Sequence, residues 1–380
     1  MPGLCALVIT TSARLAWHVL LELKARGYFI VVAGDGEAGL LRISRLCDRF
    51  VKCGLDADEA HLGDASSVIR GLIAEYPGCI VIAADLRGAL LMANLAPGTA
   101  VSAFPRLDAP TLETLNNKWT FAETCRELDI PIPETVLFER KPEADFASLS
   151  SVLGSPFIVK PIGLLGGMGV IRIESEQQLK SEVIDNAEYP AATLIAQSFV
   201  EGADGGVSIL SVGGVVRHCA VHVYEGDNVR YFQHSGAIAC ARKIADHFKL
   251  DGVVEFDVRF APDGEKYAFL EANPRFWGSA RAASWCGLDF AGASADIASG
   301  RASNEPAELT SGVFPGYLHT LRMMLKDRSV WTALNQKQRR ALIARFTDPF
   351  VLSTGLIHLR RIILTQIFPF LHIHRARGDQ

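Results

Sequence analysis

The stretch that most constrains this chain is a hairpin pattern at residues 254–275, VEFDVRFAPDGEKYAFLEANPR. Polar and apolar residues alternate along its first half, so Glu255, Asp257 and Arg259 share one face of a strand and apolar residues occupy the other. The residues Pro-Asp-Gly at 262–264 supply a tight turn. The pattern predicts two antiparallel strands with one face on a core and a charged face opposite.

The acids of this hairpin suggest a metal site. Asp257 and Glu271 are equidistant from Gly264, so a hairpin closing there sets them side by side, and Asn273 falls on the same face as Glu271. Two carboxylates and an amide oxygen held together repel one another unless a hard cation such as magnesium sits between them. The alternative is a surface hairpin with ordinary charges.

A glycine-rich segment upstream suggests phosphate binding. Lys160 ends an apolar strand and is followed by four glycines, Gly163, Gly166, Gly167 and Gly169, and then by another apolar strand. Glycines allow backbone N–H groups to approach phosphate oxygens, and the lysine adds a fixed cation. The segment differs from a Walker A loop because no Gly-Lys-Ser/Thr is present. A flexible hairpin turn is the alternative.

A third segment, 194–210, offers a place for a nucleoside. An apolar strand leads through Gln197 into the turn Glu-Gly-Ala-Asp, which ends at Asp204. A linking backbone segment, 197–200, can present a donor and an acceptor to an adenine edge, and Asp204 can hold ribose hydroxyls.

Composition narrows the class of protein. The chain has 380 residues, a net charge of −4 and no basic cluster, so we expect no nucleic-acid partner. Its eight cysteines occur singly, which predicts free thiols in a reducing compartment. The N-terminus lacks the basic region of a signal peptide, and no apolar run approaches the roughly 20 residues of a membrane span. We therefore expect a cytoplasmic protein without a transmembrane segment.

Residues 1–108 alternate strand and helix, which predicts a parallel sheet with helices on both faces. Within this part, Gly34–Gly39 matches GxGxxG, with Asp56 about twenty residues on, as in dinucleotide sites. The match follows the second strand, whereas the fingerprint normally follows the first. We interpret it as a glycine-rich turn, with a nicotinamide-dependent enzyme as the weaker alternative.

Taken in order, these motifs resemble one family. The lysine of VKP, the glycine-rich loop, a Q-x-Φ-Φ-x-G-x-D segment (Φ apolar) and D…E-x-N-P-R are similar to the pattern of ATP-grasp ligases over residues 110–300, in the carboxylate–amine ligase and carbamoyl-phosphate-synthase-like branch. The resemblance implies a mixed α/β and α+β fold in four parts: a Rossmann-like pre-ATP-grasp domain (1–108), a small lobe with a linker helix and glycine-rich lid (109–196), a large lobe with the metal site (197–312) and a helical C-terminal segment (313–380).

The resemblance also implies site residues. Metal ligands would be Asp257, Glu271 and Asn273, and catalytic residues Lys160, Arg275 and Arg281. The residues expected to hold the nucleotide are Lys118, Ile158, Lys160, Gly166, Gly167, Gly169, Gln197, Ser198, Phe199, Val200, Asp204 and Leu270. The pair Gln197-Ser198 departs from the commoner Glu-Lys pair, which puts the adenine contacts in doubt.

The implied activity is that of an ADP-forming ligase using ATP with Mg²⁺ or Mn²⁺. A small carboxylate would be activated as an acyl-phosphate and joined to an amine, giving an amide or peptide bond. The alternatives are an inactive nucleotide-binding regulatory module and a bicarbonate-activating, carbamoyl-forming enzyme. Small-molecule acids and amines are the expected partners, and a homo-oligomer is compatible with the sequence.

Some residues stay open. His218 and His222 lie four apart on a strand and so on one face, either near the acceptor substrate or as ordinary strand histidines. Arg281 is a candidate carboxylate clamp or a surface arginine. Helical spacing is seen at 317–326, 331–346 and 356–368. The last of these is apolar and basic, which suits a helix packed on the protein or one touching a membrane surface or a partner.

Overall fold

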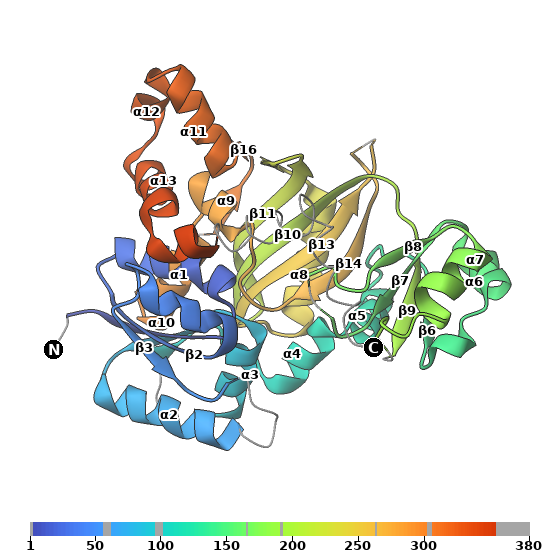
Figure 1. Cartoon of the computed structure of the whole chain (residues 1–380), viewed down its shortest axis with the longest axis horizontal. Helices are drawn as coiled ribbons and strands as arrows, with labels where there is room; N and C mark the ends of the chain where they lie inside the picture. The colour runs from blue at the N-terminus through green and yellow to red at the C-terminus, as the bar shows by residue number, and fades with distance from the viewer. Residues whose placement is uncertain are drawn as a thin grey trace, which may run out of the picture.

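The computed structural model describes residues 3–55, 62–95, 102–164, 166–190, 193–262, 264–301 and 306–354. It contains three sheets, with five parallel strands near the N-terminus, four antiparallel strands in the middle of the chain and a larger, mostly antiparallel sheet after them. The large sheet lies at the centre, with the N-terminal sheet and the small sheet on opposite sides of it (Figure 1). The predicted α/β and α+β fold class is confirmed.

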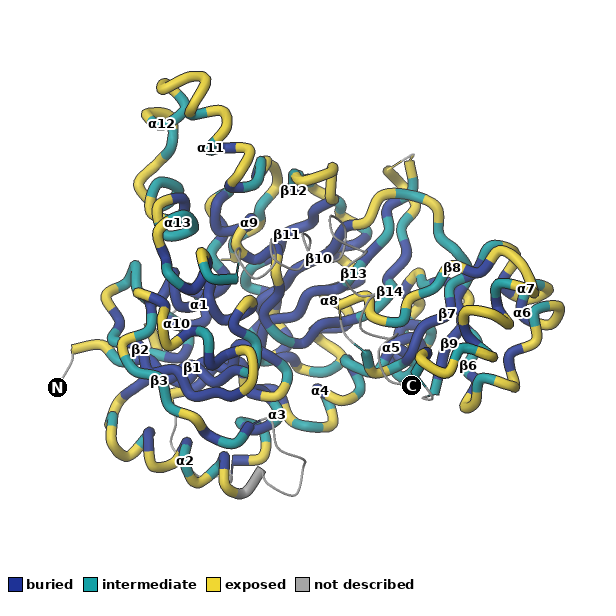
Figure 2. The backbone as a smooth tube through the Cα atoms, viewed as in Figure 1, coloured by how far each residue is buried: buried dark blue, intermediate teal, exposed yellow. Residues whose placement is uncertain are grey.

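The N-terminal sheet has the strand order β3-β2-β1-β4-β5. Its strands are β1 (Cys5–Thr10), β2 (Phe29–Gly34), β3 (Arg49–Lys52), β4 (Ile80–Ala83) and β5 (Ser102–Ala103). The connections are α1 (Ala13–Ala25), the 3₁₀ helix η1 (Gly36–Ile43), α2 (Leu62–Glu75) and α3 (Leu86–Asn94). Alternate residues of β1 enter different cores, Ala6 and Val8 on one side and Leu7 and Ile9 on the other, so both faces of the sheet are covered. Figure 2 shows β1 and β2 as largely buried strands.

The small sheet has the order β6-β9-β7-β8. Its strands are β6 (Thr135–Phe138), β7 (Phe157–Pro161), β8 (Ile171–Ile173) and β9 (Leu194–Ser198). The elements η3 (Lys141–Glu143), α6 (Phe146–Leu153), α7 (Glu176–Leu179) and the π turn η4 (Lys180–Ile184) accompany it. The buried side chains of this sheet form a compact core of their own, separate from that of the large sheet.

The large sheet runs β14-β13-β10-β11-β12-β16, with β15 paired to β11. Its strands are β10 (Ala203–Val212), β11 (Val215–Glu225), β12 (Asn228–Phe232), β13 (Gly252–Phe260), β14 (Tyr267–Asn273), β15 (Ala307–Leu309) and β16 (Gly312–Phe314). One face packs on α4 (Ala109–Asn116), α5 (Lys118–Glu127) and α8 (Ser235–His247). The other shares a core with α1, α9 (Ala280–Trp285) and α10 (Phe290–Ala298).

Two features bear on the expected domain bounds. Strand β9 ends at Ser198, two residues beyond the expected end of the small lobe at 196. The helices α4 and α5, expected in the small lobe, bury Leu112, Leu115 and Phe121 against the large sheet. The bounds of the four parts stay a prediction.

The C-terminal helices are α11 (Tyr317–Lys326), α12 (Ser329–Ala333) and α13 (Gln336–Thr347), and α11 and α12 project away from the sheets (Figure 1). The single helix expected over 331–346 is wrong, because Asn335 caps α13 in a reciprocal capping box with Gln338 and breaks it from α12. The segment 356–368, with its expected helix and surface contact, lies outside the described residues. No described helix is long and apolar enough to cross a membrane.

Candidate functional site

A cavity of about 390 Å³ lies between the small sheet and the β13–β14 hairpin. Its lining comes from α5, β7, the glycine-rich loop, β9, the turn before β10, and both strands of the hairpin. Twelve of the residues expected from the sequence line it: Lys118, Ile158, Lys160, Gly167, Gln197, Ser198, Phe199, Val200, Asp204, Asp257, Leu270 and Glu271. The structure thus brings together residues that are up to 153 positions apart, a span from Lys118 to Glu271 (271 − 118).

The hairpin sets its acids side by side, as predicted. In the antiparallel ladder Asp257 pairs with Glu271, and Glu255 pairs with Asn273. The register shifts next to this pair and leaves Leu270 without a partner on β13. The carbonyl oxygen of Leu270 instead accepts a hydrogen bond from Lys160 Nζ at 3.5 Å, so the bulge joins the hairpin to β7 across the cavity.

Burial dominates the electrostatics of these carboxylates. Burial, with the like charges of Glu255 and Glu271, raises the pKa of Asp257 well above its usual range. Burial raises the pKa of Glu255 to about 7. Burial alone would also raise the pKa of Glu271, but Lys118 and Lys160 hold it below its usual value. The Lys118 ammonium lies 3.4 Å from the Glu271 carboxylate.

The donor set fits a divalent cation. Asp257 and Glu271 are adjacent acids, and the pKa of Asp257 is raised, so its ionised form is disfavoured. Within the described chain no lysine or arginine nitrogen lies within 4.0 Å of Asp257. Carboxylate and amide oxygens are the ligands that Mg²⁺ and Mn²⁺ accept, and such a cation would restore the ionised form of both acids.

The lysines face the same space from two elements. Lys160, 5% exposed on β7, has its pKa lowered to about 8, chiefly by burial and against the attraction of Glu271. Lys118, at the first turn of α5, donates from Nζ to the carbonyl oxygen of Leu164 at 2.6 Å. This bond ties the start of α5 to the glycine-rich loop.

Only part of the glycine-rich loop lines the cavity. Gly166, Gly167 and Gly169 have φ values of +66°, +77° and +71°, and Gly167 lines the cavity whereas the other two do not. A Cβ at Gly169 would lie 2.9 Å from the ring of Pro161. The carbonyl oxygen of Gly169 accepts a hydrogen bond from the hydroxyl of Tyr189 at 2.7 Å. The loop is therefore held in place at Gly169, whereas Gly167 faces the cavity with its backbone accessible.

Only part of segment 197–200 is free to contact an adenine ring. The side-chain amide of Gln197 is buried and donates from Nε2 to Thr135 Oγ1 at 2.9 Å, which fastens β9 to β6. The backbone of 198–200 and the wall residues Ile158 and Leu270 remain at the cavity. Asp204 lies at its rim, 3.3 Å from Arg259.

Besides Gly166 and Gly169, three expected residues lie outside the cavity lining, namely Asn273, Arg275 and Arg281. Arg275 donates to Asn273 Oδ1 at 2.7 Å and to the carbonyl of Phe276 at 2.9 Å, so the amide oxygen of Asn273 is already engaged. Arg281 is exposed on α9 and borders a small hollow with His18 and Tyr317. Their roles stay a prediction.

Two charged residues at the site were missed. Arg259 lines the cavity, stacks over Phe199 with 5.3 Å between guanidinium and ring, and pairs with Asp204. Glu255 accepts a hydrogen bond from Ser279 at 2.9 Å, buried two residues before Asp257. The alternation of polar and apolar residues along 255–259 places both side chains on the face of Asp257, and this pattern could have identified them as site residues.

His222 and the GxGxxG match have structural explanations. His222 is 1% exposed, burial lowers its pKa to about 4, and its Nε2 is 3.9 Å from Glu255. Gly34 ends β2 where a Cβ would lie 2.1 Å from the Thr10 carbonyl oxygen, and Gly36 begins η1. Close packing of β1 on β2 thus accounts for the first glycine of the match.

Known proteins resemble this chain in sequence and in fold. The family described as "ATP-grasp in the biosynthetic pathway with Ter operon" matches residues 191–318. The arginine-specific large chain of carbamoyl phosphate synthase from Bacillus subtilis (strain 168) is 27% identical over 180 residues, which are 43% of this chain and 17% of that protein. The chain therefore spans less than a fifth of this relative.

Solved structures share the fold. The L-amino acid ligase from Bacillus licheniformis superposes with a TM-score of 0.60 at 17% identity, covering 78% of this chain and 75% of that one. The N5-carboxyaminoimidazole synthetase from Staphylococcus aureus, complexed with ADP, gives a TM-score of 0.64 at 16% identity, covering 82% and 81%. At these identities the likeness is one of fold.

Proposed function

We propose that the chain is an ATP-grasp enzyme and, on that premise, an ATP- and magnesium-dependent ligase that forms a C–N bond. Its substrates are a small-molecule carboxylate and an amine, and its products are an amide or peptide, ADP and phosphate. The observation that carries this proposal is the convergence of Lys118, Lys160, Asp257 and Glu271 on one cavity.

In this proposal the nucleotide lies in the cavity. Ile158 and Leu270 flank the adenine, the backbone of 198–200 meets its edge, and Asp204 with Arg259 stands at the ribose. The phosphates extend toward Lys118, Lys160 and the backbone of Gly167. A volume of about 390 Å³ lies within the range of small-molecule and cofactor sites.

Asp257 and Glu271 hold the cation in this proposal, with Asn273 as a further oxygen ligand once Arg275 releases it. A bound Mg²⁺ supplies charge neutralisation at the phosphate oxygens. Lys160 adds a cation at the same place, because it is buried and held near the hairpin by the Leu270 carbonyl.

The bond changes balance without a covalent enzyme intermediate. A carboxylate oxygen attacks the γ-phosphorus of ATP, the β–γ bridging bond breaks, and ADP leaves. The amine nitrogen then attacks the acyl-phosphate carbon, phosphate departs, and the nitrogen loses a proton. The loop around Gly166 and Gly167 shields the acyl-phosphate from water, because Gly167 lines the cavity and the loop is anchored by the hydrogen bond to the Gly169 carbonyl.

A screen for ADP and phosphate release tests the proposal. Amino acids and organic acids are paired with amines, and bicarbonate is included as a separate acid. Turnover with an acid–amine pair and its loss in Glu271→Gln are expected, with Glu176→Gln, an exposed acid on α7, as the matched control. Turnover with bicarbonate alone would favour a carbamoyl-forming enzyme. Nucleotide binding without turnover on any pair would favour a regulatory module.

A further inference from the structure

A second cavity, of about 610 Å³, lies where α1 meets α12 and α13 (Figure 1). Its lining comes from the last turns of α1, the segment between η1 and β3, Trp331 of α12 and one face of α13. It shares no lining residue with the first cavity. Its volume lies within the range of small-molecule sites, and no step of the proposed ligase reaction uses it.

Apolar side chains form one wall of this cavity. Leu21 and Leu46 belong to the core that the N-terminal sheet shares with the large sheet, and Trp331 and Ala344 pack against that core. Ile343 lines the same cavity and is 51% exposed. The apolar wall therefore runs from the core to the solvent.

The charged side chains of the lining are mostly cations. They are Lys24, Arg45, Arg339, Arg340 and one acid, Asp348. The carboxylate of Asp348 is buried and accepts hydrogen bonds from Ser44 Oγ at 2.7 Å, from the backbone N–H of Arg45 at 3.2 Å and from that of Phe350 at 2.9 Å. The acid is thus engaged within its own surroundings, and the cavity keeps an excess of positive charge.

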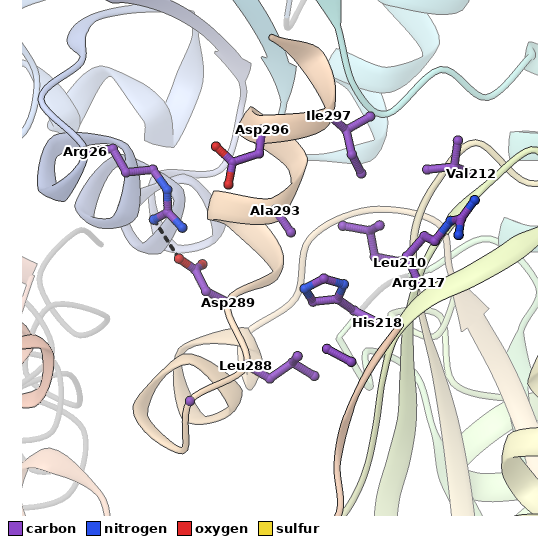
Figure 3. Close-up of a pocket in the computed structure, with 12 residues that line it drawn as sticks. Arg26, Leu210, Val212, Arg217, His218, Leu288, Asp289, Ala293, Asp296 and Ile297 are labelled. Carbon is purple, nitrogen blue, oxygen red and sulfur yellow. Dashed lines mark ion pairs between the residues drawn. The ribbon is translucent and has the colours of Figure 1, made fainter. Parts of the chain in front are cut away.

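Cations at the end of α1 are paired with acids. Lys24 lies 2.5 Å from Asp48, and Arg26 lies 2.7 Å from Asp289 (Figure 3). Arg26 therefore turns toward α10 and takes no part in the second cavity.

The three arginines of the lining have no such acid. Arg340 reaches from α13 to α1 and donates to the carbonyl oxygen of Ala25 at 3.3 Å. Arg339 donates to the carbonyl oxygen of Trp331 at 3.1 Å and stacks over its ring at 5.5 Å. Among the described residues, no carboxylate oxygen lies within 4.0 Å of the guanidinium of Arg45, Arg339 or Arg340. Carbonyl oxygens orient these groups and leave their full charge in place.

The sequence beyond the described helices does not complement this charge. Residues 355–380 carry four arginines and a single acid, Asp379. Like charges disfavour an interface, so this composition favours an anion that comes from outside the chain.

Uncharged polar side chains are few in the described lining of the cavity. They are Gln336 and Thr347, and the Thr347 hydroxyl already donates to the carbonyl oxygen of Ile343 at 2.8 Å. A bound peptide would need partners for its backbone N–H and C=O groups, whereas an alkyl chain needs none. The lining therefore suits an alkyl chain better than a peptide.

We propose that this cavity binds an amphiphile with an anionic head group and an unbranched alkyl chain, such as a fatty-acid anion. The chain packs on Leu21, Trp331 and Ile343, and the head group meets Arg45 and Arg340. The planar fork of arginine suits a carboxylate, and each methylene group removed from water adds to the affinity. The proposal does not rest on the ligase activity.

Calorimetric titration of the full chain with decanoate, below its micelle concentration, tests the proposal. Three analogues each change one feature: decyl maltoside has an uncharged head group, decyltrimethylammonium has a cationic one, and butyrate lacks most of the chain. Decanoate is expected to bind at least about tenfold more tightly than each of them. Equal affinity for decanoate and decyl maltoside, or no saturable binding of decanoate, would overturn the proposal.

Variants locate the site. Ile343→Glu puts a negative charge on the exposed end of the apolar wall and is expected to weaken decanoate binding at least about tenfold. Val152→Glu, at a 58% exposed valine on α6, is the matched control and is expected to leave binding unchanged. Arg45→Gln with Arg340→Gln should abolish the preference for decanoate over decyl maltoside. The denaturation midpoint of each variant reports on its folding.

A second assay separates a free amphiphile from a membrane surface. The full chain and the double arginine variant are sedimented with phosphatidylcholine vesicles that contain phosphatidylglycerol. Sedimentation of the full chain that the double variant loses, without binding of free decanoate, would overturn the proposal in favour of a membrane-docking surface. Decanoate binding that is unchanged in both Ile343→Glu and the double variant would place the ligand elsewhere and overturn it too.

Discussion

Two groups of buried acids stand on the same side of the large sheet and are treated differently by the rest of the chain. The hairpin acids are Glu255, Asp257 and Glu271, of which Asp257 and Glu271 line the first cavity. The interdomain acids, Glu22 on α1 and Asp289 at the start of α10, lie where the N-terminal part meets α13.

Both interdomain acids are in direct contact with cations of the chain. Arg26 is 2.7 Å from Asp289, and Lys337 is 3.3 Å from Asp289 and 3.2 Å from Glu22. At the hairpin the one such contact in the described chain is between Lys118 and Glu271, at 3.4 Å, and Lys160 bonds to a backbone carbonyl instead.

The difference separates architecture from function. The acids in contact with several of the chain's own cations hold elements together, whereas we propose that the less fully paired hairpin acids take a cation from solution. The same reasoning sets aside a metal at His18, Glu22 and Asp289, whose ligand atoms lie within 4.8 Å of one another, because Arg26 and Lys337 already occupy the acids.

The largest expected effect is on the hairpin side. Glu271→Gln should reduce ADP-forming turnover by about 10²–10³-fold, because it removes a charged oxygen ligand at the phosphates. The denaturation midpoint should stay the same or rise, since a like charge beside Asp257 is lost. A variant that keeps full turnover would contradict the functional assignment of the hairpin.

Among the interdomain acids, Asp289→Ala should lower the free energy of unfolding and leave the catalytic turnover unchanged. It leaves Arg26 and Lys337 without their shared acid and removes the side-chain cap that accepts from Gly292 N at 2.9 Å. We expect a loss of about 3 kcal/mol in the free energy of unfolding, measured by urea denaturation. Asp296→Ala, two helical turns further along, where the carboxylate is half-exposed and 4.0 Å from Arg301, should change it by no more than about 0.5 kcal/mol.

The pH dependence of stability tests the same cluster. Burial, with the charge of Asp289, raises the pKa of Glu22 to about 7 from 4.5. The folded state then holds a proton that the unfolded state loses, so this group makes stability fall as pH rises from about 4.5 to 7. Glu22→Gln should gain about 3 kcal/mol relative to wild type over that window, seen as diverging denaturation midpoints. Parallel midpoint curves would show that Glu22 ionises normally.

The smallest effect is expected in the loop beside the hairpin. Gly169→Ala places a methyl group 2.9 Å from Pro161 at a φ of +71°, and should weaken nucleotide binding about tenfold. Gly163→Ala is the matched control, because a Cβ there meets nothing within 4 Å and its φ is not positive. Equal binding by both variants would mean that the loop does not shape the cavity.

Local patterns predicted much of the site. The equal spacing of Asp257 and Glu271 from Gly264 predicted that they pair across the hairpin, as they do. The alternation along the strands predicted which face of the hairpin carries them. Lys160 at the end of β7 also lies where the motif places it. These features depend on residues within one hairpin or one strand, for which side-chain periods are decisive.

Contacts between distant segments could not be read in this way. Glu22 and Asp289 come together because α1 packs on α10, where they share Lys337. Gln197 turns to Thr135 because β6 and β9 pair. The break at Asn335 did have a local signal, Asn-x-x-Gln, which the apolar spacing of 331–346 concealed.

The central claim is that the hairpin acids take a divalent cation together with the nucleotide. Its direct test is the affinity of a non-hydrolysable ATP analogue measured by calorimetry with Mg²⁺ and with EDTA. The account predicts that Mg²⁺ tightens binding to the wild type at least about tenfold and that Asp257→Asn with Glu271→Gln removes this gain. Equal affinity of the wild type in Mg²⁺ and EDTA, or a full magnesium effect in the double variant, would contradict it.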